Sequence, residues 1–264
     1  MLSYQHGFHA GNKADVLKHA VLDALLRDLK EAKSPIFYVE THAARGVYDL
    51  KGDASEKTGE AADGVLAMLE ETSVPKPLRP WLSEVREDGI HAYKGSCAIA
   101  ADRLRSKDRM VLFERHPAEY NALTEALGDD DRIRIQKADG YAGALKLTPR
   151  RGEQMVVFVD PSYETLRDMD ELAQWAPRAL SKWPQAILIL WLPLFKDERE
   201  AEFGAFLSEL EDGVIAGARW APDLEKDTAL SGSAIVAYRV SDKAKDTATR
   251  ISAALQSYWS QGLI

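Results

Sequence analysis

The tetrapeptide Asp160-Pro161-Ser162-Tyr163 follows an apolar run at residues 155–159 and carries the most specific chemistry in the chain. Proline fixes the backbone of the turn after this run and leaves its own carbonyl outside any helix. Asp160 adds a carboxylate beside that carbonyl, and Tyr163 adds a flat ring. Two acceptors and a stacking surface suit a planar base with an exocyclic amine. An ordinary β-turn is the alternative interpretation.

Methyl transfer to a base amine is the reaction that this group of residues could support. The amine of adenine is a weak nucleophile because its lone pair is delocalised into the ring. Two acceptors on its hydrogens favour a more tetrahedral nitrogen, and one of them can remove the proton as the new bond forms. The matching electrophile is a sulfonium methyl group, which is already activated, so alignment in a closed pocket supplies most of the catalysis. Neither a metal nor a protein nucleophile is needed.

Polar residues also follow three other strand-like runs. Residues 41–46 form a small-residue turn, which lets the backbone approach a nucleotide-like ligand closely. Glu114 can accept both hydroxyls of a ribose, or it is a solvated glutamate at a strand end. Asp139, followed by Gly140, can contact an adenine amine or simply build a turn.

The elements that must position these residues alternate along the chain. Strand-like runs occur at residues 36–40, 110–113, 132–135, 155–159, 186–192 and 234–240. Helical spacing predicts a helix at 14–31, capped by Asn12, and later helices around residues 203–210 and 251–259. This alternation predicts an α/β fold with a doubly wound, mainly parallel sheet. Ligands of such sheets bind at the carboxyl ends of the strands, where the polar residues fall.

Residues 51–107 differ from this pattern. They are mostly helical in pattern, contain Pro75, Pro77 and Pro80, and show no convincing strand. We therefore expect a helical insertion subdomain at residues 51–107, and a catalytic domain formed by residues 1–50 and 108–264.

The composition is that of a globular protein, with 45% hydrophobic and 29% charged residues in 264. No stretch approaches the roughly 20 apolar residues of a membrane helix, and the N-terminus lacks the apolar core of a signal peptide. We therefore expect a cytoplasmic protein without a membrane partner. The one cysteine, Cys97, excludes a disulfide framework and a multi-cysteine zinc site. Methylation of cytosine at C5 needs a cysteine nucleophile, and Cys97 is not preceded by proline.

The net charge of −8 argues, by itself, against a nucleic-acid partner. The charge is uneven, however: residues 1–150 hold 22 basic and 24 acidic side chains, whereas residues 151–264 hold 12 and 18. A face that meets phosphate must therefore come mainly from the first part. The basic side chains expected to be available to phosphate are Lys13, Lys18, Lys94, Arg103, Arg105 and Lys107.

Nearly the whole chain resembles the class I S-adenosylmethionine-dependent methyltransferases, and more closely the RlmJ family of 23S rRNA adenine-N6 methyltransferases. The residues that carry the resemblance are Met1-Leu2-Ser3-Tyr4, His6, Phe8-His9-Ala10-Gly11-Asn12, Ala14-Asp15-Val16-Leu17-Lys18-His19, Thr41-His42-Ala43, Gly46, Tyr48, Thr58-Gly59-Glu60, Gly95-Ser96, Glu114, His116-Pro117, Lys137-Ala138-Asp139-Gly140, Asp160-Pro161, Tyr163-Glu164 and Ser231-Gly232.

The resemblance implies a seven-stranded, Rossmann-like catalytic domain, S-adenosylmethionine as the cofactor and 23S rRNA as the partner. Separately, we expect a monomer. It implies that the target base flips into a pocket at the tetrapeptide. The implied cofactor-binding residues are His19, His42, Ser96, Glu114, Asp139 and Gly140. The implied catalytic residues are Asp160, Tyr163, His6 and Lys18, and the implied substrate contacts are Tyr4 and Pro161. Tyr4, His6 and Lys18 belong to an N-terminal segment that closes over cofactor and target.

No metal is expected, because His6, His9 and His19 lack the i, i+4 helical pairing of a zinc motif.

Two positions depart from the family pattern. Ala44-Arg45-Gly46 replaces the usual Gly-x-Gly pair, and the methyl group of Ala44 is tolerable only if that backbone has a negative φ and clears the ligand. Ser162 replaces the second proline of Asp-Pro-Pro-Tyr, which makes the turn less rigid but keeps the carbonyl of Pro161. Two other functions therefore stay open: a DNA adenine-N6 methyltransferase, and a non-catalytic nucleic-acid-binding factor linked to the use of external DNA.

Overall fold

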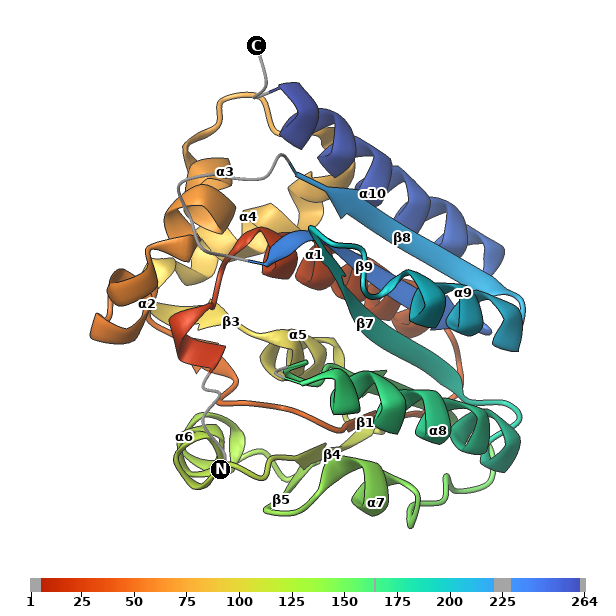
Figure 1. Cartoon of the computed structure of the whole chain (residues 1–264). Helices are drawn as coiled ribbons and strands as arrows, with labels where there is room; N and C mark the ends of the chain where they lie inside the picture. Colours follow the sequence, from red (N-terminus) through yellow and green to blue (C-terminus); the bar gives the residue numbers. More distant parts are fainter. Residues whose placement is uncertain (1–5, 164, 221–228, 262–264) are drawn as a thin grey trace.

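A seven-stranded sheet forms the centre of the structure, a computed structural model that describes residues 6–163, 165–220 and 229–261 (Figure 1). Its strands are β1 (Ile36–Glu40), β4 (Arg109–Phe113), β5 (Ile133–Gln136), β6 (Gln154–Val159), β7 (Ile187–Phe195), β8 (Gly213–Arg219) and β9 (Leu230–Tyr238). The strand order is β5-β4-β1-β6-β7-β9-β8, with the first five parallel and β9 antiparallel to both of its neighbours. The predicted doubly wound, mainly parallel, seven-stranded sheet is confirmed.

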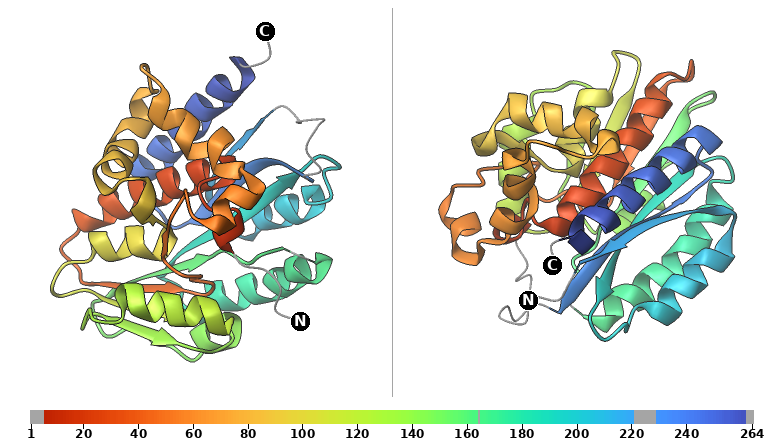
Figure 2. Two further views of the ribbon diagram at one scale, coloured as in Figure 1. Left: turned by 90° about the vertical axis from the view of Figure 1, so that its left-hand side faces the viewer. Right: turned by 90° about the horizontal axis from the view of Figure 1, so that it is seen from above.

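Helices cover both faces of this sheet. They are η1 (His6–Phe8), α1 (Lys13–Lys30), α2 (Asp53–Thr58), the π-helix η2 (Ala62–Leu66), α3 (Ala67–Glu70), η3 (Lys76–Leu78), α4 (Arg79–Asp88), η4 (Ile90–Ala92), α5 (Ser96–Arg103), α6 (Pro117–Leu127), α7 (Gly140–Ala144), α8 (Leu166–Lys182), α9 (Ala201–Leu210) and α10 (Asp242–Gln261). Figure 1 shows α7, α8 and α9 on one face, and α1, α5 and α10 on the other. The view from above in Figure 2 shows α1 and α10 packed side by side.

The central strand β1 is buried along its whole length, from Ile36 to Glu40. It pairs with β4 on one side and β6 on the other, and helices cover both faces, so its residues do not alternate between apolar and polar. One consequence is that Glu40, a carboxylate at the carboxyl end of β1, is also completely buried.

The first long helix, α1, begins where the sequence predicts. Asn12 has extended backbone angles, and its side-chain oxygen accepts a hydrogen bond of 2.9 Å from the backbone N–H of Asp15. This cap satisfies one of the free N–H groups at the start of the helix. Because α1 packs against β9 and α10, its first turn is held firmly beside the sheet.

Residues 51–107 contain the predicted helices, but the expectation of no strand there is wrong. Tyr93 and Lys94 form β3 (Tyr93–Lys94), which pairs antiparallel with β2 (Val47–Tyr48). A two-residue strand is too short to show a period of two in the sequence. The division of the chain into a catalytic domain and an insertion subdomain stays a prediction.

Three strands of the sheet differ from the sequence prediction, and one of them, β9, begins at Leu230 and ends at Tyr238 instead of spanning residues 234–240. The whole of β8 was not predicted, because Gly213, Gly217 and its alanines give it little β-strand signal. β7 continues past residue 192 through Pro193. The proline is compatible with the strand because β6 pairs with β7 only as far as Leu190, so one edge of β7 is free at residue 193.

Across the part of the chain that the structure describes, every helix is too short or too polar to span a bilayer.

Candidate active site

A cavity of about 490 Å³ opens at the carboxyl ends of β1, β4, β5, β6 and β7. Its lining includes every predicted site residue that the structure describes: His6, Lys18, His19, His42, Ser96, Glu114, Asp139, Gly140, Asp160, Pro161 and Tyr163. Tyr4, the predicted substrate contact, lies outside the described residues. The parallel strands thus bring widely separated parts of the chain to one site.

The turn after β1 is bound to the end of β4 through a carboxylate. Glu114 accepts hydrogen bonds from the backbone N–H groups of Ala44, at 2.8 Å, and His116, at 2.6 Å. Burial raises the pKa of Glu114, although these hydrogen bonds act in the opposite direction. Ala44 has a φ of 50°, so the condition of a negative φ at this position is not met. An alanine in this left-handed conformation is strained by about 1–2 kcal/mol.

The end of β5 leads directly into the short helix α7, which begins at Gly140. Asp139 caps this helix by accepting a hydrogen bond of 2.8 Å from the backbone N–H of Ala142. A Cβ atom at Gly140 would lie 1.9 Å from the carbonyl oxygen of Thr41. Only glycine therefore allows the N-terminus of α7 to approach the end of β1 this closely. Of the two roles predicted for Asp139, a contact to an adenine amine or a turn, the structure shows the turn. The exposed carboxylate of Asp139 also borders the cavity.

A buried hydrogen-bond network joins the end of β1 to the start of α5. Ser96 donates to one oxygen of Glu40 at 2.5 Å, and Tyr38 donates to the other at 2.8 Å. Burial raises the pKa of Glu40 to about 8, more than the two hydrogen bonds lower it. Glu40 is therefore protonated at neutral pH and fixes the position of Ser96 without adding a negative charge.

The end of β6 carries Asp160 and Pro161 into the cavity. Lys18 reaches across from α1, and its ammonium lies 2.8 Å from Asp160 Oδ2. The same ammonium lies 2.8 Å from Asp15 Oδ1 and 5.1 Å from the ring centre of Trp191. Burial lowers the pKa of Lys18, but the two carboxylates raise it by more than burial lowers it. The pKa of Lys18 therefore lies above its usual value. Lys18 is a permanent buried cation at the predicted reaction centre.

Tyr163 is held in one orientation. Its hydroxyl donates a hydrogen bond of 2.7 Å to the carbonyl of Trp191, and the two rings meet edge to face at 5.4 Å. The backbone of Tyr163 has a φ of 50°, a second left-handed residue without glycine at this site. Such strain persists only where the surroundings hold the backbone in place.

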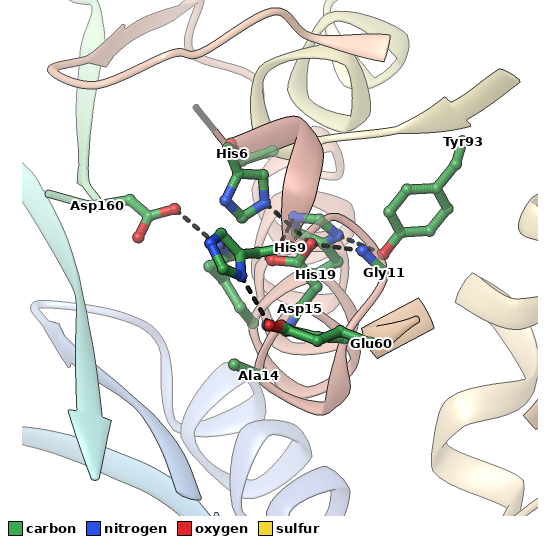
Figure 3. Close-up of polar contacts among 12 residues, drawn as sticks. His6, His9, Gly11, Ala14, Asp15, His19, Glu60, Tyr93 and Asp160 are labelled. Carbon is green, nitrogen blue, oxygen red and sulfur yellow. Dashed lines mark hydrogen bonds and ion pairs between the residues drawn. The ribbon is translucent and has the colours of Figure 1, made fainter. Parts of the chain in front are cut away.

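Asp15 is the centre of the N-terminal side of the cavity (Figure 3). Its Oδ2 accepts a hydrogen bond of 2.9 Å from the backbone N–H of Gly11 and lies 3.0 Å from His6 Nε2. Its Oδ1 lies 2.8 Å from the Lys18 ammonium. Burial raises the pKa of Asp15, but His6, Lys18 and His19 lower it well below its usual range. Asp15 is therefore a buried carboxylate that stays ionised.

Glu60 attaches the same N-terminal segment to residues 51–107. Its two oxygens bind His9 Nδ1 at 2.8 Å and Asn12 Nδ2 at 2.9 Å. Nearby, a Cβ atom at Gly64 would lie only 2.1 Å from the carbonyl oxygen of Gly11. The start of α1 therefore packs directly against the π-helix η2.

Two of the histidines that line the cavity, His19 and His42, are neutral at pH 7. Burial lowers the pKa of His19 to about 3 and that of His42 to about 4. His19 Nδ1 lies 2.8 Å from the Tyr93 hydroxyl, and His42 Nδ1 lies 2.8 Å from the Thr41 hydroxyl. No group of three or more potential metal ligands occurs within the described ranges.

The expectation that six basic side chains are available to phosphate is wrong for the two that are buried, Lys18 and Arg103. Arg103 is buried against Asp23 and Glu84, and Lys18 is buried between two carboxylates. Lys94 forms ion pairs with Asp88 and Asp102. Arg105 forms an ion pair with Asp108. These cations stabilise the fold because carboxylates lie within reach, which a charge count does not show.

Among the cavity residues with no role assigned from the sequence are Asp15, Glu60 and Trp191. Asp15 and Glu60 belong to the motifs that carry the family resemblance, which was the available signal. Trp191 reads only as part of an apolar strand.

The sheet order, with an antiparallel β9 inserted between β7 and β8, and the cavity at the carboxyl ends define a class I S-adenosylmethionine-dependent methyltransferase. Residues 33–252 match the family model described as ribosomal RNA large subunit methyltransferase D, RlmJ. The chain belongs to this RlmJ family. It is 34% identical over 198 residues to ribosomal RNA large subunit methyltransferase J of Escherichia coli K12, a match that covers 74% of this chain and 71% of the relative.

A second curated relative and one solved structure are also similar to the chain. The methyltransferase J of Haemophilus influenzae is 34% identical over 199 residues, again covering 74% of this chain and 71% of the relative. A crystal structure of a Legionella pneumophila protein superposes with a TM-score of 0.85 at 27% identity, covering 96% of this chain and 95% of that one.

Proposed function

We propose that this protein transfers a methyl group from S-adenosylmethionine to N6 of an adenine in 23S rRNA. The observation that carries the proposal is the position of Asp160 and Pro161, which supply a carboxylate and a carbonyl at the end of β6, inside the cavity. Membership of a family of large-subunit rRNA methyltransferases supports the choice of RNA. Such a substrate would keep the enzyme in the cytoplasm.

The residues at the ends of β1, β4 and β5 fit a cationic nucleoside cofactor. Glu114 and Asp139 offer carboxylates for ribose hydroxyls and a base amine. His19 and His42 are neutral, as their low pKa values require, and so they do not repel a sulfonium. S-adenosylmethionine supplies an activated methyl group when it is bound. His19, His42, Ser96, Glu114, Asp139 and Gly140 are the residues that we propose hold it.

The target adenine would enter beside Asp160 after it leaves the RNA stack. Lys18 lies against Asp160 Oδ2, so Oδ1 is the oxygen that we propose accepts a hydrogen bond from the base amine. The carbonyl of Pro161 is the second acceptor. Tyr163, fixed by its bond to the Trp191 carbonyl, would hold the base, to which stacking contributes about 1–3 kcal/mol. Loss of the amine proton to Asp160 then completes the transfer.

The test is label transfer from methyl-labelled S-adenosylmethionine to two substrates, 23S rRNA fragments and duplex DNA. We expect label in the RNA alone, and mass spectrometry should find it as N6-methyladenine. Label in DNA but not in RNA would favour a DNA adenine methyltransferase. Binding of RNA without cofactor binding, measured by calorimetry, would favour a non-catalytic nucleic-acid-binding factor.

A further inference from the structure

Asp15 contacts three neighbouring parts of the cavity wall: the short helix η1, the turn before α1 and the next turn of α1. It contacts His6 from η1, the backbone of Gly11 from the turn, and Lys18 one turn further along α1. Gly11 has a φ of 78°, so the turn that Asp15 holds is one that a side chain would strain. Figure 3 shows His6, Gly11 and His19 around this carboxylate, with Asp160 to the left of it.

The contacts of Asp15 continue to the proposed reaction centre through a single cation. Lys18 lies between Asp15 and Asp160, with 2.8 Å to each carboxylate, and is only 2% exposed. A flexible lysine side chain held between two fixed carboxylates has little freedom left. The position of the ammonium against Asp160 therefore depends on Asp15.

We propose that Asp15 is a positioning residue for methyl transfer, which holds Lys18 against Asp160 and His6 against the same cavity wall. This inference rests on the proposed function. Asp15 acts through Lys18 and His6, and on the cofactor side its Oδ1 also lies 3.8 Å from His19 Nε2.

Removal of the Asp15 charge changes the electrostatics of Lys18 in a defined direction. Lys18 is faced by Asp15 from α1, by Asp160 from β6 and by the Trp191 ring from β7, while Glu40 from β1 is close enough to interact. Burial lowers the pKa of Lys18 and the carboxylates raise it. With asparagine at position 15, one carboxylate remains, so the pKa of Lys18 falls and its charge is lost at a lower pH.

The experiment compares Asp15→Asn with a matched control, Asp23→Asn. Asp23 lies on the same helix, is equally buried and also pairs with cations, Arg27 at 2.7 Å and Arg103 at 2.8 Å. Both variants are measured for melting temperature, for S-adenosylmethionine affinity by calorimetry, and for the methyl-transfer rate as a function of pH.

We expect both variants to melt at a lower temperature, because each leaves a buried cation poorly paired. Asp15→Asn should also lower the transfer rate of the folded protein about a hundredfold, as expected for a misplaced catalytic group. The alkaline limb of its pH profile should move to lower pH. Asp23→Asn should keep the wild-type rate and profile.

A wild-type rate and an unchanged pH profile in Asp15→Asn would overturn the inference, as would equal losses of rate in the two variants. If the wild type itself transfers no methyl group, the proposed function fails. The effect of Asp15 on Lys18 is then tested by a measurement that does not depend on activity. Nitrogen NMR of the Lys18 ammonium measures its pKa directly. A pKa that is the same in Asp15→Asn and in the wild type would refute the role of Asp15, and a lowered pKa would support it.

Discussion

Lys18 and Asp160 are 142 residues apart in the chain, and their side chains form an ion pair of 2.8 Å. The pair connects the first long helix to the end of the fourth parallel strand of the sheet, across the cavity. It is almost fully buried on the lysine side. A buried pair of this kind is costly to break on one side, since the remaining charge loses its partner.

Replacement of Asp160 by asparagine tests the proposed proton acceptor. The amide keeps the size of the side chain but cannot accept the amine proton, so we expect the single-turnover rate to fall by about 10²–10⁴-fold. The affinity for S-adenosylmethionine, measured by calorimetry, should stay close to that of the wild type. Asp170→Asn, at an exposed position of α8, is the control and should keep full activity. Turnover at the wild-type rate in Asp160→Asn would show that another group accepts the proton.

Gly140→Ala should disturb the cofactor side of the cavity. The new methyl group would overlap the carbonyl oxygen of Thr41, so α7 must move away from β1. We expect a loss of about 1–3 kcal/mol in the free energy of unfolding and a weaker affinity for S-adenosylmethionine. Gly204→Ala in α9 is the control, because its Cβ would lie 3.5 Å from Leu192 in ordinary contact. Equal stabilities and affinities for Gly140→Ala and the wild type would contradict the crowding argument.

Ala44→Gly should stabilise the protein. Glycine relieves a left-handed strain of about 1–2 kcal/mol, while its greater freedom in the unfolded chain costs about 0.4–1 kcal/mol. The free energy of unfolding in urea should therefore rise by about 0.5–1 kcal/mol, the difference of these two estimates. Ala43→Gly in the same turn has no such strain to relieve, since Ala43 is not among the residues with positive φ, and should lower stability. A loss of stability in both variants would argue against strain at Ala44.

Glu40→Gln should change how stability depends on pH. Burial raises the pKa of Glu40 in the folded state to about 8, above its value of 4.5 in the unfolded chain. The contribution of the protonated carboxyl is fully present below pH 4.5 and is lost progressively as pH rises through 8. The neutral amide does not ionise. Urea titrations should therefore show the variant gaining stability relative to the wild type between these pH values, and a constant difference would refute the raised pKa.

The sheet and the position of polar residues at its strand ends could be predicted because their signals are local. The run ending at Asp160, the cap at Asn12 and the acid at Glu114 each depend on a few neighbouring residues. Ala44 could not be predicted in the same way: its φ depends on Glu114, a residue 70 positions away, which accepts the backbone N–H at this turn.

Ion pairs between residues that are far apart in the chain could not be predicted from the sequence either. Arg103 reads as a surface cation next to a helix end, but it is buried against Asp23, 80 positions earlier. Asp15 likewise reads as an ordinary polar residue in the first turn of a helix. Its importance depends on Lys18 meeting Asp160, and such a contact cannot be inferred from spacing along one helix.

The position of β9 has a consequence for how the chain is made. β9 follows every other strand that the structure describes in the sequence, yet it lies inside the sheet, between β7 and β8. Until residues 230–238 have left the ribosome, β7 has an unpaired apolar edge and β8 has no neighbour to join. A chain that stops short of residue 230 would expose this edge and tend to aggregate. The sheet, and with it the β7 side of the cavity, is therefore completed only after residues 230–238 have been synthesised.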